Sequence, residues 1–105
     1  FIPHIDKNRC FKVMIYLCDV KKKDGPLHLI KINPEKFENQ RRNLSKNYFL
    51  NKENSINNLN LNDFIDCSGQ RGTSIFFDTN CPHFAGKFER NSIERLIYRV
   101  NFYYN

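Results

Sequence analysis

The stretch FKVMIYLCDV, residues 11–20, decides the fold of this chain. Its apolar side chains fall on both alternating faces of an extended backbone, with Val13 and Ile15 on one face and Met14 and Tyr16 on the other. Apolar residues on both faces are typical of a strand that is covered on both sides. We therefore expect residues 11–20 to form a buried strand.

The residues that follow predict a turn and a second strand. The segment KKKDGP (21–26) contains Gly25 and Pro26, which favour a turn, and LHLIKI (27–32) alternates between apolar and polar residues. Two strands joined by a short turn are typical of an antiparallel pair. We therefore expect residues 11–20 and 27–32 to form a hairpin.

The middle and last thirds of the chain differ in pattern. PEKFENQRRNLSKNYF (34–49) begins with a proline and predicts one helix, whereas the Asn-rich LNKENSINNLNLND (50–63) predicts a loop that serves as a lid or an insertion. Further extended segments are expected at 72–78, 81–86 and 94–104. Few helices and many short strands predict a mainly β sandwich or barrel.

Length and charge limit the classes of protein to consider. The 105 residues suffice for one small domain, residues 1–105, and the early start of a strand after Phe1 leads us to expect a fragment of a longer chain that lacks N-terminal structure. A net charge of +6 could attract nucleic acid. Because the basic residues form no single stripe and Lys, Asn and Ile are abundant throughout, we do not expect nucleic acid as a partner.

The cysteines and the hydropathy bear on the cellular location of the protein. The four cysteines, Cys10, Cys18, Cys67 and Cys81, have no CxxC spacing and are too sparse for a disulfide scaffold, so we expect free thiols. No apolar run approaches the roughly 18 to 20 residues of a membrane span. No signal peptide is visible. The expectation is a soluble cytoplasmic domain.

The segment FIPHIDKNRC (1–10) carries the first candidate metal ligands. On a strand, residues i and i+2 point to the same face about 7 Å apart, so His4 and Asp6 can direct an imidazole nitrogen and a carboxylate oxygen at one point. His83 follows a turn, a strand and a tight turn and can reach back to them. Two histidines and one carboxylate suit non-haem Fe(II) with open coordination positions.

These segments together resemble a known family. The order PHID (3–6), VMIYLCDVKKKDGPLHLI (13–30), GQRGTSIFFDTNCPHFAG (69–86) and ERLIYRVNFY (94–103) is similar to the phytanoyl-CoA dioxygenase-like branch of the Fe(II)/2-oxoglutarate-dependent oxygenases, over nearly the whole chain. The resemblance implies a double-stranded β-helix, which is a jelly-roll, cupin-like barrel. It also implies a dioxygenase that uses O2 to hydroxylate an unidentified small-molecule or lipid-like substrate, with release of succinate and CO2.

The resemblance also assigns roles to residues. It implies that His4, Asp6 and His83 hold Fe(II) and that Arg95, on the last barrel strand, pairs with the far carboxylate of 2-oxoglutarate. A planar guanidinium that stays charged suits a carboxylate. Two departures stand out: HLIKINP replaces a common G-S-H segment, and Ile97 occupies a place where a polar carboxylate partner is often found.

Strand alternation around Arg95 carries a further expectation. If Arg95 and Arg99 point inward, Leu96, Tyr98, Val100 and Phe102 point outward as an apolar row. In the family, helices that precede the H-x-D strand cover this sheet. The resemblance therefore implies that a missing N-terminal layer covers the row.

Two other residues and two other functions complete the sequence-based hypotheses. We assign His28 no role, and we expect Asp78 to support a turn or to orient a ligand imidazole. One alternative is a cupin-type metal-binding protein, although HID lacks the second histidine of the cupin H-x-H pair. The other is a non-catalytic β-sandwich interaction module, which predicts that His4, Asp6 and His83 lie apart.

Overall fold

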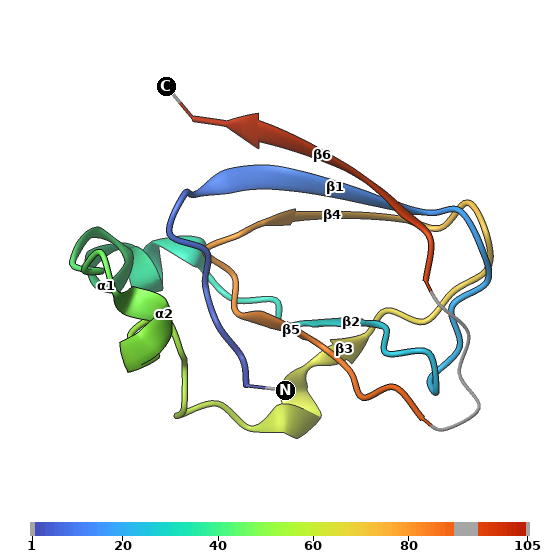
Figure 1. Cartoon of the computed structure of the whole chain (residues 1–105), viewed down its shortest axis with the longest axis horizontal. Coiled ribbons are helices and arrows are strands. Elements are labelled where there is room, and N and C mark those ends of the chain that lie inside the picture. The colour runs from blue at the N-terminus through green and yellow to red at the C-terminus, as the bar shows by residue number, and fades with distance from the viewer. Residues whose placement is uncertain (1, 90–94, 105) are drawn as a thin grey trace.

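The computed structural model describes residues 2–89 and 95–104. The strands and helices in chain order are β1 (Cys10–Tyr16), β2 (Leu27–Leu29), the 3-10 helix η1 (Pro34–Phe37), α1 (Glu38–Arg42), α2 (Tyr48–Asn51), the 3-10 helix η2 (Leu61–Asp63), β3 (Ile65–Asp66), β4 (Ser74–Asp78), β5 (His83–Ala85) and β6 (Ile97–Tyr103). They build two three-stranded antiparallel sheets, ordered β4-β1-β6 and β3-β2-β5, which face each other in Figure 1. The prediction of a mainly β domain is confirmed.

The expected hairpin of residues 11–20 and 27–32 is wrong. β1 pairs with β4 and β6, whereas β2 pairs with β3 and β5, so the two strands belong to different sheets. The segment between them crosses from one sheet to the other, and on the way Val20 forms a backbone bridge with Gly69. Alternation of side chains predicts the faces of a strand but does not say which strand pairs with it.

The described residues form no closed barrel. A jelly roll has eight strands in two sheets, whereas this structure has six strands, and β4 and β6 are the open edges of one sheet. The isolated bridge of Val20 to Gly69 joins the two segments that cross between the sheets, whereas the bridge of Asp24 to Phe88 joins the region before β2 to that after β5. The expectation of a barrel is therefore met only at the level of two facing antiparallel sheets.

The single helix predicted for residues 34–49 is divided into three short pieces. Asn33 caps η1 by accepting a hydrogen bond from the backbone of Glu35 at 3.0 Å, and α1 follows directly but ends at Arg42. α2 begins only at Tyr48. The intervening NLSKN is rich in Asn and Ser, whose side chains compete for backbone hydrogen bonds and so interrupt helices.

The segment 50–63, predicted as a loop, pairs with the N-terminal residues. Its backbone pairs with the chain start, because Ile5 donates to Asn54 at 3.0 Å and Ile56 donates to Pro3 at 2.8 Å. Ile56 is buried against Ile5 and Phe37. The Asn-rich composition of the segment gave no indication of this backbone pairing.

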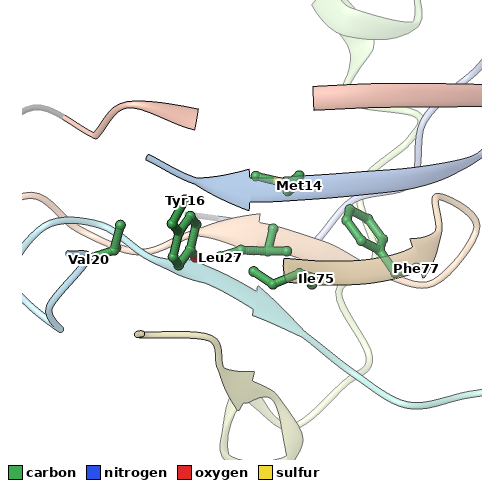
Figure 2. Packing of buried hydrophobic residues seen from close by; sticks show 6 residues of the cluster. All are labelled: Met14, Tyr16, Val20, Leu27, Ile75 and Phe77. Atoms are coloured by element: carbon green, nitrogen blue, oxygen red, sulfur yellow. The ribbon is translucent and has the colours of Figure 1, made fainter. Parts of the chain in front are cut away.

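The main hydrophobic core lies between the sheets. Figure 2 shows Met14 and Tyr16 of β1, Leu27 of β2, and Ile75 and Phe77 of β4 pointing into this layer, joined by Val20. The hydroxyl of Tyr16, a fully buried side chain, donates to the carbonyl of Cys67 at 2.9 Å. The inner faces of β1, β2 and β4 therefore enclose the hydrophobic core that supports the side chains of the candidate site.

The outer face of the β4-β1-β6 sheet is apolar and exposed. Tyr98 and Phe102 of β6 are 56% and 57% exposed, and Phe76 of β4 is 60% exposed. The outward direction of this row agrees with the expectation from strand alternation. In contrast, the expectation that residues 11–20 are covered on both sides is wrong for the described part of the chain, since Phe11 and Leu17 are also exposed.

Two sequence-based expectations, on membrane-spanning helices and on the cysteines, can be compared with the structure. Within the described residues no helix is long and apolar enough to cross a membrane. All four cysteines are free thiols, as predicted.

Candidate metal centre

Two histidines far apart in sequence are brought together by backbone pairing. The amide of His4 donates to the carbonyl of His83 at 3.1 Å, and the amide of His83 donates to the carbonyl of His4 at 3.1 Å. Residues that exchange both hydrogen bonds in an antiparallel pair lie directly opposite, with side chains on the same face. Their ring centroids are accordingly 4.6 Å apart.

Asp6 joins the two histidines because it lies two residues after His4 on the same extended segment. One ligand atom from each of His4, Asp6 and His83 lies within 4.8 Å of the others, and no second such group of three occurs in residues 2–89 and 95–104. Between them Ile5 points the opposite way and is fully buried. The carbonyl of Ile5 accepts a hydrogen bond from Asn54 Nδ2 at 3.1 Å, which fixes the segment further.

A tight turn delivers His83 to this position. The turn after β4 is closed by a hydrogen bond from the Cys81 amide to the Asp78 carbonyl at 2.8 Å, and the Asp78 carboxylate accepts one from the Asn80 amide at 2.9 Å. The same carboxylate accepts hydrogen bonds from Arg9 at 2.7 Å and from Tyr104 at 3.1 Å. Asp78 therefore supports the turn, as expected, and orients no imidazole.

Both ligand imidazoles are held by backbone carbonyls instead. His4 Nδ1 lies 3.2 Å from the carbonyl of Ile2, and His83 Nδ1 lies 2.8 Å from the carbonyl of Cys81. Because a carbonyl only accepts, each hydrogen bond places a proton on Nδ1, so that Nε2 is the nitrogen available to a metal ion. Burial and the neighbouring charge of His83 lower the pKa of His4, which favours its neutral form.

The Asp6 carboxylate is ionised and already has two nitrogen neighbours. Its Oδ1 lies 3.3 Å from His83 Nε2, and its Oδ2 lies 3.1 Å from Lys12 Nζ. Burial is the largest influence and raises the pKa, but the hydrogen bond from His83 and the charges of His83 and Lys12 together lower the pKa of Asp6 to about 2. Asp6 is thus available as a carboxylate ligand at neutral pH.

Arg95 lies beside the triad. It lines the same cavity, of about 190 Å³, as His4, Asp6 and His83. Its Nε atom is buried and has no hydrogen-bond partner among the described residues, and its guanidinium lies 5.6 Å from the centre of the Phe88 ring. A buried donor without a partner is rare in folded proteins and points to a ligand that completes it.

Two further cations line this cavity that the sequence pattern did not assign to the site. Lys12 and Arg99 come from β1 and β6, where Lys12 shares the inner face with Met14, and Arg99 lies opposite Met14. A lysine on the face that also carries buried residues was the signal that could have singled out Lys12.

His28 stays outside the site, as expected. Its ring stacks on Phe84 with centroids 4.7 Å apart, and its Nδ1 lies 3.1 Å from the carbonyl of Pro26. Its Nε2 lies 3.9 Å from Asp66. These contacts give His28 a structural role in the β3-β2-β5 sheet.

The largest hollow on the described surface, about 690 Å³, lies away from the triad. Its side chains form an ion-pair network in which Arg9 pairs with Glu35 at 2.8 Å and with Asp78 at 2.7 Å, and Arg41 pairs with Glu38 at 2.6 Å. Because its charges pair with one another, this hollow is explained as a structural connection between α1 and the end of β4.

The geometry of the site separates the sequence-based hypotheses, whereas the comparisons with known proteins do not. The three ligands meet, contrary to the prediction of the interaction-module alternative that they lie apart. Comparisons with protein-family models, curated proteins and solved structures found no significant match. The chemistry of the site therefore has to be inferred from its own residues.

Proposed function

We propose that this protein is a non-haem Fe(II)- and 2-oxoglutarate-dependent dioxygenase that hydroxylates an organic substrate. The observation that carries the proposal is the convergence of His4, Asp6 and His83 within 4.8 Å, beside the unpartnered Nε of Arg95. The two features belong to one cavity. Together they combine a metal-ligand set with a cation suited to an organic acid.

The donor set suits a divalent first-row metal ion. Two neutral imidazoles and one carboxylate leave coordination positions for other ligands, which is the arrangement of non-haem Fe(II) oxygenases. The carbonyls behind His4 and His83 fix both rings with Nε2 available, as is usual for metal-binding histidines. His4, Asp6 and His83 would hold the ion.

The cavity walls suit 2-oxoglutarate. Arg95 would bind the distal carboxylate, since its guanidinium is charged, partly buried and without an acidic partner among the described residues. Met14, Leu27 and Phe77 supply apolar walls that exclude water. When bound, Fe(II), 2-oxoglutarate and O2 supply the chemistry that converts a C–H bond to C–OH, with release of succinate and CO2.

The strand order supports the finer proposal of a jelly roll. The antiparallel pairs are nested: β2 pairs with β3, β1 pairs with β4, and residue 4 pairs with β5. β6 then pairs with the other side of β1. Nested antiparallel strands that divide between two facing sheets are typical of this fold.

A second hollow, of about 400 Å³, is the proposed substrate entrance. It shares His4, Asp6 and Lys12 with the smaller cavity, and Tyr48, Phe49 and Tyr103 contribute aromatic rings to its wall. Small-molecule sites are concave and combine apolar or aromatic side chains with polar groups that orient the ligand. An organic substrate entering here would reach His4 and Asp6 through a hollow that neither Arg95 nor Arg99 lines.

Anaerobic titration with Fe(II) and 2-oxoglutarate tests the proposal. Chelation of Fe(II) by a 2-oxo acid produces a weak visible charge-transfer band, which His83→Ala should abolish because it removes a ligand. Arg95→Ala should weaken 2-oxoglutarate binding roughly tenfold or more, since it removes a charge-assisted contact. His28→Ala is the matched histidine control and should leave the band unchanged.

The same titration separates the competing functions. A wild-type protein that retains neither metal nor band would contradict the oxygenase proposal. Retention of the metal without any band would favour the cupin-type metal-binding protein instead.

A further inference from the structure

The cavity beside the triad carries more positive charge than the described protein neutralises. Lys12, Arg95 and Arg99 line it, whereas Asp6 is its only acidic wall residue. Asp6 is already paired with Lys12 at 3.1 Å. Among residues 2–89 and 95–104, no carboxylate pairs with Arg95 or Arg99, which leaves two guanidinium groups without an anion.

Both arginines line the cavity from the same face of one extended segment, Arg95 partly buried and Arg99 exposed. The pairing of β6 with β1 continues to Leu96, whose carbonyl accepts a hydrogen bond from Leu17 at 2.9 Å, so residues 95, 97 and 99 share the inner face. Ile97 lies between the arginines and packs against the core. Arg95 and Arg99 also share a second hollow with Ile97 and Phe88.

The two charges affect each other. Burial is the main cause that lowers the pKa of Arg95, and the positive charge of Arg99 acts in the same direction, opposing the effect of Tyr16. Two guanidinium groups that line one cavity, one of them partly buried, repel each other unless an anion neutralises them. The arrangement is therefore suited to an anion rather than to a neutral group.

Ile97 leaves a site with a single arginine short of hydrogen-bond donors for a carboxylate. An isoleucine donates no hydrogen bond, so it cannot assist Arg95 in binding a carboxylate, which has about four acceptor positions. Arg99 follows two residues later on the same face and supplies donors that Ile97 lacks. A pair of guanidinium groups is well matched to one carboxylate.

Resting on the proposed function, we propose that Arg99 is a second binding residue for the distal carboxylate of 2-oxoglutarate, acting together with Arg95 across Ile97. The pair makes the site specific for a 2-oxo acid with a second carboxylate. Phe88 assists by holding the Arg95 guanidinium against its ring.

Binding of two 2-oxo acids to the Fe(II)-loaded protein tests this role without measuring turnover. 2-Oxoglutarate and 2-oxopentanoate share the chelating group, but 2-oxopentanoate has a methyl group where 2-oxoglutarate has the distal carboxylate. Arg99→Gln should weaken 2-oxoglutarate binding roughly tenfold or more and leave 2-oxopentanoate binding unchanged, because only the first ligand contacts Arg99. Arg99→Lys, which keeps the charge, should restore part of the lost affinity.

Arg71→Gln is the matched control, because Arg71 is an exposed arginine outside the cavity. It should bind both acids like the wild-type protein. Unchanged binding of 2-oxopentanoate also shows that the Arg99 variants fold and retain the metal.

The outcomes distinguish the two proposals. If Arg99→Gln changes neither affinity, or weakens both acids equally, the role of Arg99 is overturned while the oxygenase proposal stands. If the wild-type protein gives no charge-transfer band with either acid, the proposed function fails and the role of Arg99 fails with it.

Discussion

Lys12 places a positive charge next to the carboxylate of the candidate metal centre. Its ammonium lies 3.1 Å from Asp6 Oδ2, so it occupies one side of the only carboxylate in the ligand set. An ammonium and a divalent ion attract the same carboxylate and repel each other. We therefore expect Lys12 to weaken metal binding by His4, Asp6 and His83 while it keeps Asp6 ionised.

Replacing Lys12 tests this competition. Lys12→Met keeps an unbranched side chain of similar length but removes the charge, so Co(II), a visible substitute for Fe(II), should bind roughly tenfold tighter. Titration followed by visible absorption measures the affinity. The control is Lys7→Met, because Lys7 lies near the same ligands but donates to the carbonyl of Ser45 at 3.4 Å instead of pairing with Asp6. Unchanged or weaker Co(II) binding by Lys12→Met would mean that the lysine orients Asp6 and does not compete.

At the scale of the elements, β4 carries a phenylalanine on each face, and the two side chains lie in opposite environments. Phe76 and Phe77 are consecutive in sequence, but Phe76 is 60% exposed on the outer face and Phe77 is 4% exposed in the core. The Phe77 ring also lies 5.1 Å from the His83 ring and approaches it edge-on. The stability of the domain and the support of a metal ligand therefore depend on the inner face of this strand.

The two phenylalanines form a matched pair for a stability measurement. Phe77→Ala should lower the free energy of unfolding by about 3–5 kcal/mol, because it leaves a cavity between the sheets. Phe76→Ala should change it by only about 0.5 kcal/mol, since its side chain is mostly in water. Urea unfolding of both variants measures the difference. Equal losses would show that the outer face is covered in solution, contrary to its exposure here.

At the scale of the whole molecule, an ion-pair network connects the helical segment to the sheets. Glu38 of α1 pairs with Arg41 at 2.6 Å and with Arg42 at 3.4 Å, and it accepts a hydrogen bond from Asn80 in the turn that leads to His83 at 3.1 Å. Arg9 joins the same group through Asp78 at 2.7 Å. The network holds the turn before His83 against α1, which links global stability to the candidate site.

Acid should weaken this connection in a defined range of pH. The hydrogen bond from Arg41 is the main cause that lowers the pKa of Glu38 to about 2, against the effect of burial and with help from Asn80. A folded-state pKa below the ordinary value of 4.5 means that Glu38 stabilises the fold above about pH 4.5 and loses this contribution as the pH falls toward 2. Asp6 adds to the same loss, because its folded-state pKa is also about 2.

Urea unfolding across that range checks the effect. Glu38→Gln should make the free energy of unfolding depend less steeply on pH than in the wild-type protein. Asp63→Asn is the control, since Asp63 is exposed and pairs with no cation in the described part of the chain, and it should keep the wild-type slope. A Glu38→Gln slope equal to that of the wild-type protein would contradict a stabilising role of the network.

The sequence by itself determined the features that depend on neighbouring residues. Residues 11–20, 27–32 and 72–78 each contain a strand, and His4 and Asp6 lie on one face, because side-chain alternation on an extended chain is a local property. The same alternation placed Arg95 and Tyr98 on opposite faces, whereas the inward direction of Arg95 was implied by the family resemblance. Local spacing was sufficient for these predictions.

Only the tertiary structure decided which segments meet. The sequence pattern wrongly joined 11–20 and 27–32 as a hairpin, and it did not reveal that Asn54 and Ile56 fasten the H-x-D segment or that Lys12 pairs with Asp6. It also did not exclude that His83 lies apart from His4. Pairing between distant strands depends on how whole faces bury against each other, and this long-range packing leaves no periodic signal within either strand.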